Sequence, residues 1–275
     1  MPHAIQLLVF TVFGVLAATI LSSYHSNPSE STTVVSTSPP PLMTLSSSNV
    51  KILSLNPFIA HITDFVSKSE RTHLINLGKP LLRKSQVIID GKIRDAEGRT
   101  SSTAFLPEED PVVASVIQRA AEFQGYLSPK DIEVQVTSYQ PGQEVRYHYD
   151  GYADGSRPTN RISTFFAILK SNCHDCGTQF PFINTTLRHQ YDSRWCDVID
   201  CSKDVLTTKN VEGSALFWVN LDQEGKERKD MLHAGLPALR GEKVGLNVWT
   251  EPDLAELKNR GLFNSHSQYY LEAFP

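Results

Sequence analysis

The spacing of hydrophobic positions changes about halfway along the chain, and its first half favours helices. An apolar run at residues 58–66, FIAHITDFV, predicts a strand. The sequence SKSE at residues 67–70 has the spacing of a capping box, so a helix is expected from there to about Leu77. A second helix is expected after Asp110, because proline follows it and the next apolar residues recur at helical spacing.

From about residue 132 the apolar positions alternate with period two instead. The segments that show this alternation are residues 132–139, 161–169, 214–220 and 243–250. They are rich in β-branched and aromatic residues, and turn-forming pairs such as Pro141-Gly142 separate them. Helices followed by many strands favour an antiparallel sandwich or barrel, with the helices packed outside one sheet.

The beginning of the chain has a third pattern. Residues 4–21 carry no charged side chain and are near the minimum length of a membrane span, longer than the usual core of a secretory signal. Residues 24–50 are rich in Ser, Thr and Pro and cannot bury enough apolar surface to fold. The sequence therefore predicts a membrane anchor or signal peptide over residues 1–23, a lumenal stalk over 24–50 and a folded domain over 51–275.

Composition narrows the possible partners. The 275 residues are 40% hydrophobic and 20% charged, as in ordinary globular proteins, and the net charge is only −4. Because no block of basic residues occurs either, we expect no nucleic-acid partner.

Four cysteines lie close together, within residues 173–201. They are Cys173, Cys176, Cys196 and Cys201. In an oxidising compartment, two disulfides are favoured over a zinc site, although the sequence does not determine their pairing. Asn184-Thr-Thr is an N-glycosylation sequon and fits the same compartment.

A possible metal site begins at His148 and Asp150, which would share one face of a strand. Most other histidines fall in the helical half, in the cysteine segment or near the ends. His233 lies between two strand signals and is the candidate third ligand. Two histidines and one carboxylate occur in non-haem Fe(II) oxygenases and also in zinc hydrolases, so both classes stay open on this set alone.

Lys243 follows His233 by ten residues, after a turn, so the returning strand should bring it near the metal. Gly245, Asn247 and Trp249 would share its face of that strand. A buried lysine needs an anion. The anion would be either a protein carboxylate in a structural salt bridge or the carboxylate of a metal-bound oxo-acid.

With these residues, the sequence resembles the prolyl 4-hydroxylase family of Fe(II)- and 2-oxoglutarate-dependent dioxygenases. The matching segments are GRTSSTAFL (98–106), VQVTSYQPGQ (134–143), HYD (148–150), NRISTFFAIL (160–169), GTQFP (177–181), GSALFW (213–218), and the segment from His233 to Trp249. The resemblance implies a mainly β fold with flanking helices. The implied fold is a double-stranded β-helix, or jelly roll, with the helices packed on its major sheet.

The resemblance also implies roles for individual residues and a reaction. His148, Asp150 and His233 would bind iron. The other implied residues are Lys243, Thr178 and Tyr139 for 2-oxoglutarate, and Arg99, Ser101, Arg161 and Trp249 for a peptide groove. The enzyme would hydroxylate a polypeptide, above all at proline, releasing succinate and CO2, with L-ascorbate keeping the iron reduced. Alternatively, Tyr139 and Trp249 could be core aromatics, and Arg161 could only pair with an acid. Trp218 is expected in the core rather than in the site.

Several positions depart from the family pattern, and all lie on its substrate side. Val145 and Tyr147 replace a tyrosine and a proline, Ile132 stands where a glutamate is usual, and Glu251 where relatives can have histidine. These departures leave open another substrate, such as peptidyl lysine or a small molecule. A non-catalytic membrane-anchored binding module is a further alternative. The expected location is the endoplasmic reticulum membrane, with the catalytic domain in the lumen.

Overall fold

The computed structural model describes residues 49–89, 92–95, 98–125, 127–152, 157–185 and 193–262. The predicted anchor and nearly all of the predicted stalk lie outside these residues, so both stay predictions. Among the described residues, none of the helices is long and apolar enough to cross a membrane.

The two predicted helices are present and begin at the predicted residues. Helix α1 (Lys68–Gly78) starts with a complete capping box. In it, the backbone N–H of Glu70 donates to Ser67 Oγ, and that of Ser67 donates to the Glu70 carboxylate at 2.8 Å. Helix α2 (Pro111–Gln124) starts after Asp110, whose carboxylate accepts hydrogen bonds from two backbone N–H groups of the first turn.

The strands form two main sheets. The larger has eight strands in the order β1-β2-β12-β9-β14-β7-β6-β3, and the smaller has four in the order β11-β10-β13-β8. The bounds of the larger sheet's strands are β1 (Val50–Leu55), β2 (Phe58–Ile62), β3 (Arg83–Lys84), β6 (Ser102–Phe105), β7 (Ile132–Tyr139), β9 (Ser163–Ser171), β12 (Ala215–Val219) and β14 (Lys243–Thr250). Those of the smaller sheet are β8 (Val145–His148), β10 (Thr178–Asn184), β11 (Val205–Thr207) and β13 (His233–Gly235).

Five short helical elements and a hairpin complete the described chain. They are the hairpin β4 (Gln86–Ile89) and β5 (Lys92–Asp95), the 3-10 helices at Lys79–Leu81, Pro129–Asp131, Ser193–Asp197 and Lys229–Met231, and helix α4 (Leu254–Asn259). The segment expected to be one strand at residues 58–66 is shorter, because a turn follows Ile62.

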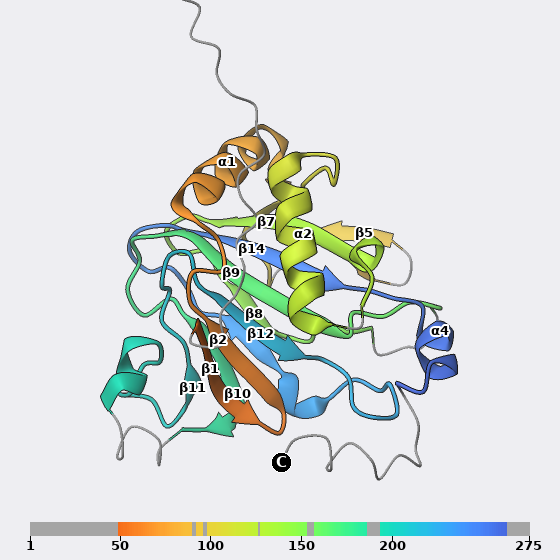
Figure 1. The fold of residues 1–275 in the computed structure, drawn as a ribbon. Helices are drawn as coiled ribbons and strands as arrows, with labels where there is room; N and C mark the ends of the chain where they lie inside the picture. The colour runs from red at the N-terminus through yellow and green to blue at the C-terminus, as the bar shows by residue number, and fades with distance from the viewer. Residues whose placement is uncertain are drawn as a thin grey trace, which may run out of the picture. The chain divides into compact units, whose positions relative to one another are not determined.

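From β7 onward the chain crosses repeatedly between the two sheets, which is the topology of a jelly roll. Strands β7, β9, β12 and β14 belong to the larger sheet, and β8, β10, β11 and β13 to the smaller. The predicted double-stranded β-helix is therefore confirmed. Helices α1 and α2 cover one face of the larger sheet (Figure 1), and their apolar residues share a core cluster with β7, β9 and β14.

The two faces of β14 show how period two separates the two cores. Val244, Leu246 and Val248 pack in the cluster under the helices. Gly245 points between the two sheets, where a Cβ atom would lie 2.4 Å from the ring of Phe166. The Phe166 ring of the neighbouring strand β9 can therefore lie over β14 only because this position has no side chain.

The cysteine-bearing segment contains two local disulfides, Cys173–Cys176 and Cys196–Cys201. The first lies between β9 and β10, and the second precedes β11. Disulfides rather than a zinc site are thus present, with a pairing that the sequence did not determine. Asn184 ends β10 with an exposed side chain. Because the third residue of its sequon lies outside the described residues, glycosylation stays a prediction.

Candidate metal centre

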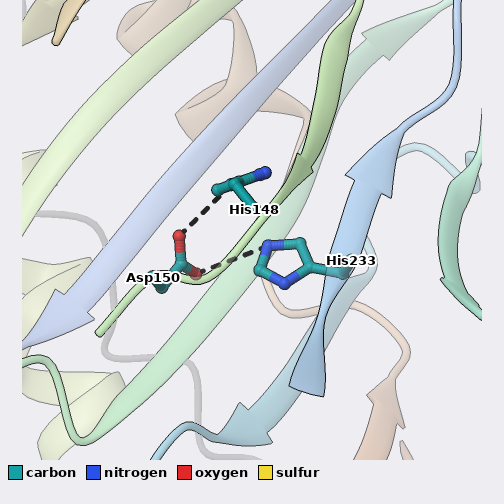
Figure 2. A group of neighbouring side chains, drawn as sticks. All are labelled: His148, Asp150 and His233. Carbon is teal, nitrogen blue, oxygen red and sulfur yellow. Dashed lines mark ion pairs between the residues drawn. The ribbon is translucent and has the colours of Figure 1, made fainter. Parts of the chain in front are cut away.

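The smaller sheet brings His148 and His233 together. They are paired residues at the adjoining ends of β8 and β13, and their ring centroids are 4.3 Å apart. Asp150 completes the group, with carboxylate oxygens 3.5 Å from His148 Nε2 and 3.7 Å from His233 Nε2 (Figure 2). One ligand atom from each residue lies within 4.8 Å of the others, close enough to share one metal ion.

Asp150 differs from the expectation in one respect, because it does not lie on the strand. Strand β8 ends at His148, opposite the first residue of β13, so no pairing partner continues the ladder. The chain bends after His148, and the carboxylate reaches the site from this bend.

Backbone carbonyls hold both imidazoles in the orientation that a metal requires. His148 Nδ1 lies 2.9 Å from the carbonyl oxygen of Arg146, and His233 Nδ1 lies 3.0 Å from that of Met231. A carbonyl can only accept, so each Nδ1 carries the proton and each Nε2 presents its lone pair to the centre. This arrangement is the usual one for metal-binding histidines.

Two hydrogen bonds in series orient the Asp150 carboxylate. Thr164 Oγ1 donates to Asp150 Oδ2 at 2.7 Å, and Asn220 Nδ2 donates to Thr164 Oγ1 at 2.9 Å. Burial raises the pKa of Asp150, but the neighbouring His233 and His148 lower it by more, so the pKa lies below its usual value. The carboxyl is therefore ionised and suited to bind a cation.

His233 lies in an aromatic surrounding that keeps it neutral. Burial, followed by the charge of His148, lowers the pKa of His233 to about 4. The Trp218 ring packs edge-on against it with centroids 4.9 Å apart. Trp218 is buried in the core between the sheets, as expected, and it also lines the cavity beside the metal-binding group.

A cavity opens from the metal-binding group into the space between the sheets. It is lined by Arg99, Tyr139, Val145, His148, Asp150, Phe166, Thr178, Trp218, His233, Gly235 and Asn247. Three of the residues that the resemblance implied, Arg99, Tyr139 and Thr178, therefore lie beside the candidate ligands. Ser101 does not line this cavity; it is buried with its Oγ 3.0 Å from Ser85 Oγ.

Lys243, at the start of β14, lies behind the cavity wall, beside the lining residue Tyr139. Its side chain is fully buried, its Nζ donates to the carbonyl oxygen of Cys176 at 2.7 Å, and Nζ lies 4.5 Å from the centroid of the Tyr139 ring. Burial lowers the pKa of Lys243 to about 7. Among the described residues, no carboxylate forms an ion pair with it, so the structural salt bridge considered above is not found.

The guanidinium of Arg161 stacks on the ring of Trp249. The Arg161 guanidinium lies 3.8 Å from the centroid of the Trp249 ring and 5.3 Å from that of Tyr152. It also forms ion pairs with Glu251 at 3.5 Å and Glu133 at 3.9 Å. The expected pairing of Arg161 with an acid is thus present, and Trp249 is buried, as the core-aromatic alternative expected. Neither residue lines the cavity, so their place in a peptide groove stays a prediction.

Val145 and Tyr147, the two departures from the family pattern that lie nearest His148, have different surroundings. Val145 is buried and lines the cavity, whereas Tyr147 is half exposed and its hydroxyl donates to Gln179 on β10. Of these two departures, Val145 is therefore the one that lies in the wall of the cavity. Three residues of the site were not expected from the sequence: Thr164, Phe166 and Asn220. Period two on β9 could have indicated the first two, because they share one face of that strand.

Comparison with known proteins decides the family. No protein-family model matches the chain. The chain is 30% identical to probable prolyl 4-hydroxylase 3 of Arabidopsis thaliana over 207 residues, covering 72% of this chain and 71% of the relative. This chain belongs to the prolyl 4-hydroxylase family. Prolyl 4-hydroxylase 2 of the same plant is 28% identical, with 78% of this chain and 73% of the relative covered.

Two further similarities concern a human protein and a solved structure. The chain is 31% identical to human prolyl 4-hydroxylase subunit alpha-3, covering 72% of this chain but only 34% of that protein. A viral collagen prolyl hydroxylase from Paramecium bursaria Chlorella virus-1, solved as a complex with 2OG, is 27% identical. The alignment covers 70% of this chain and 95% of the viral chain, with a TM-score of 0.49.

The metal-binding group fits the iron that this prolyl 4-hydroxylase family uses. Two neutral imidazoles and one carboxylate form the ligand set of non-haem Fe(II) oxygenases, which leaves other coordination positions open. The predicted family and enzyme class, a 2-oxoglutarate-dependent dioxygenase, are confirmed.

Proposed function

We propose that this protein hydroxylates proline residues in a polypeptide, with Fe(II) as metal and 2-oxoglutarate as cosubstrate. The observation that carries the proposal is the combination of the His148, Asp150 and His233 group with a buried lysine beside the same cavity, which has no carboxylate partner among the described residues. Family membership supports the reaction, and the departures on the substrate side make the substrate itself the point to test.

His148, Asp150 and His233 would hold the iron. When bound, the iron would supply the reaction of O2 with 2-oxoglutarate, in which one oxygen atom enters succinate as CO2 is released and the other hydroxylates a C–H bond of the substrate. The protein's own contribution is to fix the ligands: two carbonyls orient the imidazoles, and Thr164 orients the carboxylate.

Lys243 would bind the distal carboxylate of 2-oxoglutarate. As the region is buried, its ammonium would meet this anion with little competition from water. Thr178 and Tyr139 line the cavity and would add hydroxyl donors. Burial raises the pKa of Tyr139 to about 12, so this hydroxyl keeps its proton and can donate it in a hydrogen bond.

Arg161, stacked on the buried Trp249 ring, would form one wall of a groove for an extended peptide, because its guanidinium offers donors to peptide carbonyls. Trp249 stays a predicted groove residue only, because its indole is buried beneath Arg161. Arg99 lies in the cavity lining and would contact the same peptide. Ser101 stays a predicted groove residue only.

The experiment that tests the substrate is a turnover assay with a panel of proline-rich peptides. We expect Fe(II)-dependent formation of succinate that peptide stimulates, and hydroxyproline in the product by mass spectrometry. The His148→Ala variant serves as the control without activity. If iron and 2-oxoglutarate bind but no peptide is hydroxylated at proline, the peptidyl-proline assignment is wrong, and hydroxylysine or a modified small molecule would identify the alternative.

We further propose that the enzyme resides in the endoplasmic reticulum membrane, with its catalytic domain in the lumen and L-ascorbate as reductant for iron. Two disulfides support an oxidising compartment. Carbonate extraction and endoglycosidase digestion test the anchor and the lumenal side, with Asn184→Gln as the unglycosylated control. A protein that carbonate releases into the soluble fraction has no membrane anchor.

A further inference from the structure

The lysine proposed to bind 2-oxoglutarate depends on a disulfide for its hydrogen-bond partner. Lys243 Nζ donates to the carbonyl oxygen of Cys176 at 2.7 Å, across 67 positions of sequence. Cys176 is bonded to Cys173 in the loop between β9 and β10. Thr178, the other residue implied for the cosubstrate, begins β10 two residues after this disulfide.

One side chain links the two sulfur atoms to that carbonyl group. Asn210 Nδ2 lies 3.0 Å from the Cys176 carbonyl oxygen, 3.0 Å from Cys176 Sγ and 3.7 Å from Cys173 Sγ. Movement of either sulfur atom would therefore disturb the Asn210 amide, which also donates to the Cys176 carbonyl oxygen that accepts from Lys243.

The backbone of the loop is tightly constrained around the disulfide. Asp175 has a φ of 56°, in the left-handed region that residues with side chains rarely adopt. A Cβ atom on Gly177 would lie 1.7 Å from the carbonyl oxygen of Thr208, so the loop lies directly against the segment that carries Asn210. The disulfide ring helps to hold Asp175 in this conformation, which a reduced loop could leave.

We propose that the Cys173–Cys176 disulfide positions Lys243 for the distal carboxylate of 2-oxoglutarate, so that reduction of this disulfide weakens binding of the cosubstrate. The inference rests on the role of Lys243 in the proposed function. When the bond is broken, the sulfur atoms move apart to non-bonded distance, Asp175 is released and the Cys176 carbonyl is free to turn away from Lys243.

The disulfide is accessible to a reductant from one side. Cys173 is half-buried and Cys176 is buried, and both border a cavity of about 350 Å³. A thiolate of an incoming dithiol would attack Cys173 Sγ, break the S–S bond and release Cys176 as a thiolate. The second thiol then resolves the mixed disulfide. The dithiol is oxidised by two electrons, and the protein gains two thiols.

The test measures the dissociation constant of 2-oxoglutarate on the full chain loaded with Mn(II), before and after treatment with dithiothreitol. Loss of an oriented charged hydrogen bond predicts that this constant rises about tenfold on reduction. The affinity for Mn(II) should not change, because no metal ligand contacts the loop's sulfur atoms. Mass spectrometry after alkylation verifies which disulfide has been reduced.

The second disulfide provides a matched control. A Cys196→Ser/Cys201→Ser variant keeps only the first disulfide and should respond to dithiothreitol as the wild type does. A Cys173→Ser/Cys176→Ser variant should bind 2-oxoglutarate weakly from the start and show no response. If this variant does not fold, the comparison of oxidised with reduced wild type still decides.

Two results would overturn the proposal: an unchanged dissociation constant after verified reduction, or a response that disappears with Cys196 and Cys201. The Lys243→Ala variant separates this failure from failure of the proposed function. If Lys243→Ala binds 2-oxoglutarate as tightly as wild type, the lysine has no cosubstrate role. If it binds weakly while reduction has no effect, only the role of the disulfide is wrong.

Discussion

At the scale of single residues, the metal-binding carboxylate depends on a hydroxyl that donates only one hydrogen bond. Asn220 donates to Thr164, so the single hydroxyl proton of Thr164 must go to Asp150. Thr164 is fully buried, and no water can replace it without a rearrangement. The orientation of Asp150 toward the two histidines thus relies on this pair of neutral side chains.

A Thr164→Val substitution keeps the shape of the side chain and removes the donor. We expect it to weaken Fe(II) or Mn(II) binding about tenfold, the lower end of what loss of a partner to a metal ligand costs. Calorimetric titration of the apo protein with Mn(II) would measure this effect. Thr164→Ser keeps the hydroxyl and should bind metal almost as the wild type does. Equal affinity of the valine variant and wild type would contradict the prediction.

Lys243 predicts a pH dependence for cosubstrate binding. Burial lowers its pKa to about 7, so above this pH the free enzyme holds a neutral amine. Since the distal carboxylate binds the protonated form, binding takes up a proton, and the dissociation constant should rise about tenfold per pH unit above 7. Below pH 7 it should be nearly constant.

Titrations of 2-oxoglutarate from pH 6 to 9 with the Mn(II)-loaded enzyme would measure this dependence. Lys243→Arg is the matched control, because a guanidinium stays protonated throughout this range. Its affinity should be independent of pH, whatever its absolute value. A wild-type profile that is flat above pH 7 would show that Lys243 is already charged in the free enzyme.

The residues of the site differ in how far the sequence could predict them. His148, Asp150 and His233 could be proposed because histidines are few and two of the three lie next to strand signals. Asn220 could not, because it follows β12 and reaches Thr164 only through the pairing of β12 with β9. The support of a ligand is a product of strand register, which a local sequence pattern does not contain.

At the scale of elements, β14 holds the larger sheet together by pairing with both β7 and β9. Its alternation was readable from the sequence, and the structure places Val244, Leu246 and Val248 under the helices as that pattern requires. The need for Gly245 was not readable, because it depends on the Phe166 ring of a neighbouring strand.

A Gly245→Ala substitution should therefore destabilise the fold. The new methyl group would lie 2.4 Å from the Phe166 ring, and overpacking of this kind costs about 1–3 kcal/mol. Urea unfolding monitored by tryptophan fluorescence would measure the loss. Adding Phe166→Leu removes the clash, so the double variant should be less destabilised than the sum of the two single changes. Strict additivity would contradict the close approach.

At the scale of the whole molecule, the order of elements predicted the class of fold but not its pairing. Helices followed by alternating strands favoured an antiparallel sandwich with helices outside one sheet, which the structure shows. The order β12-β9-β14-β7 joins segments far apart in sequence, and it was not predicted; the family resemblance implied only a jelly roll. Long-range pairing is determined by complementary faces across the core, and these are not visible in any single segment.

The described chain also predicts where the folded domain begins. Strand β1 pairs with β2 at the edge of the larger sheet, and its Leu53 is buried in the core between the sheets. A chain that starts at Asn49 keeps this strand, whereas one that starts at Phe58 loses it and exposes β2 as the new edge. We expect the longer chain to unfold cooperatively and bind Mn(II). The shorter one should be less stable by several kcal/mol, because a buried leucine and a whole strand are missing. Thermal unfolding and metal titration of the two chains would measure the difference, and equal stability would show that the domain begins after β1.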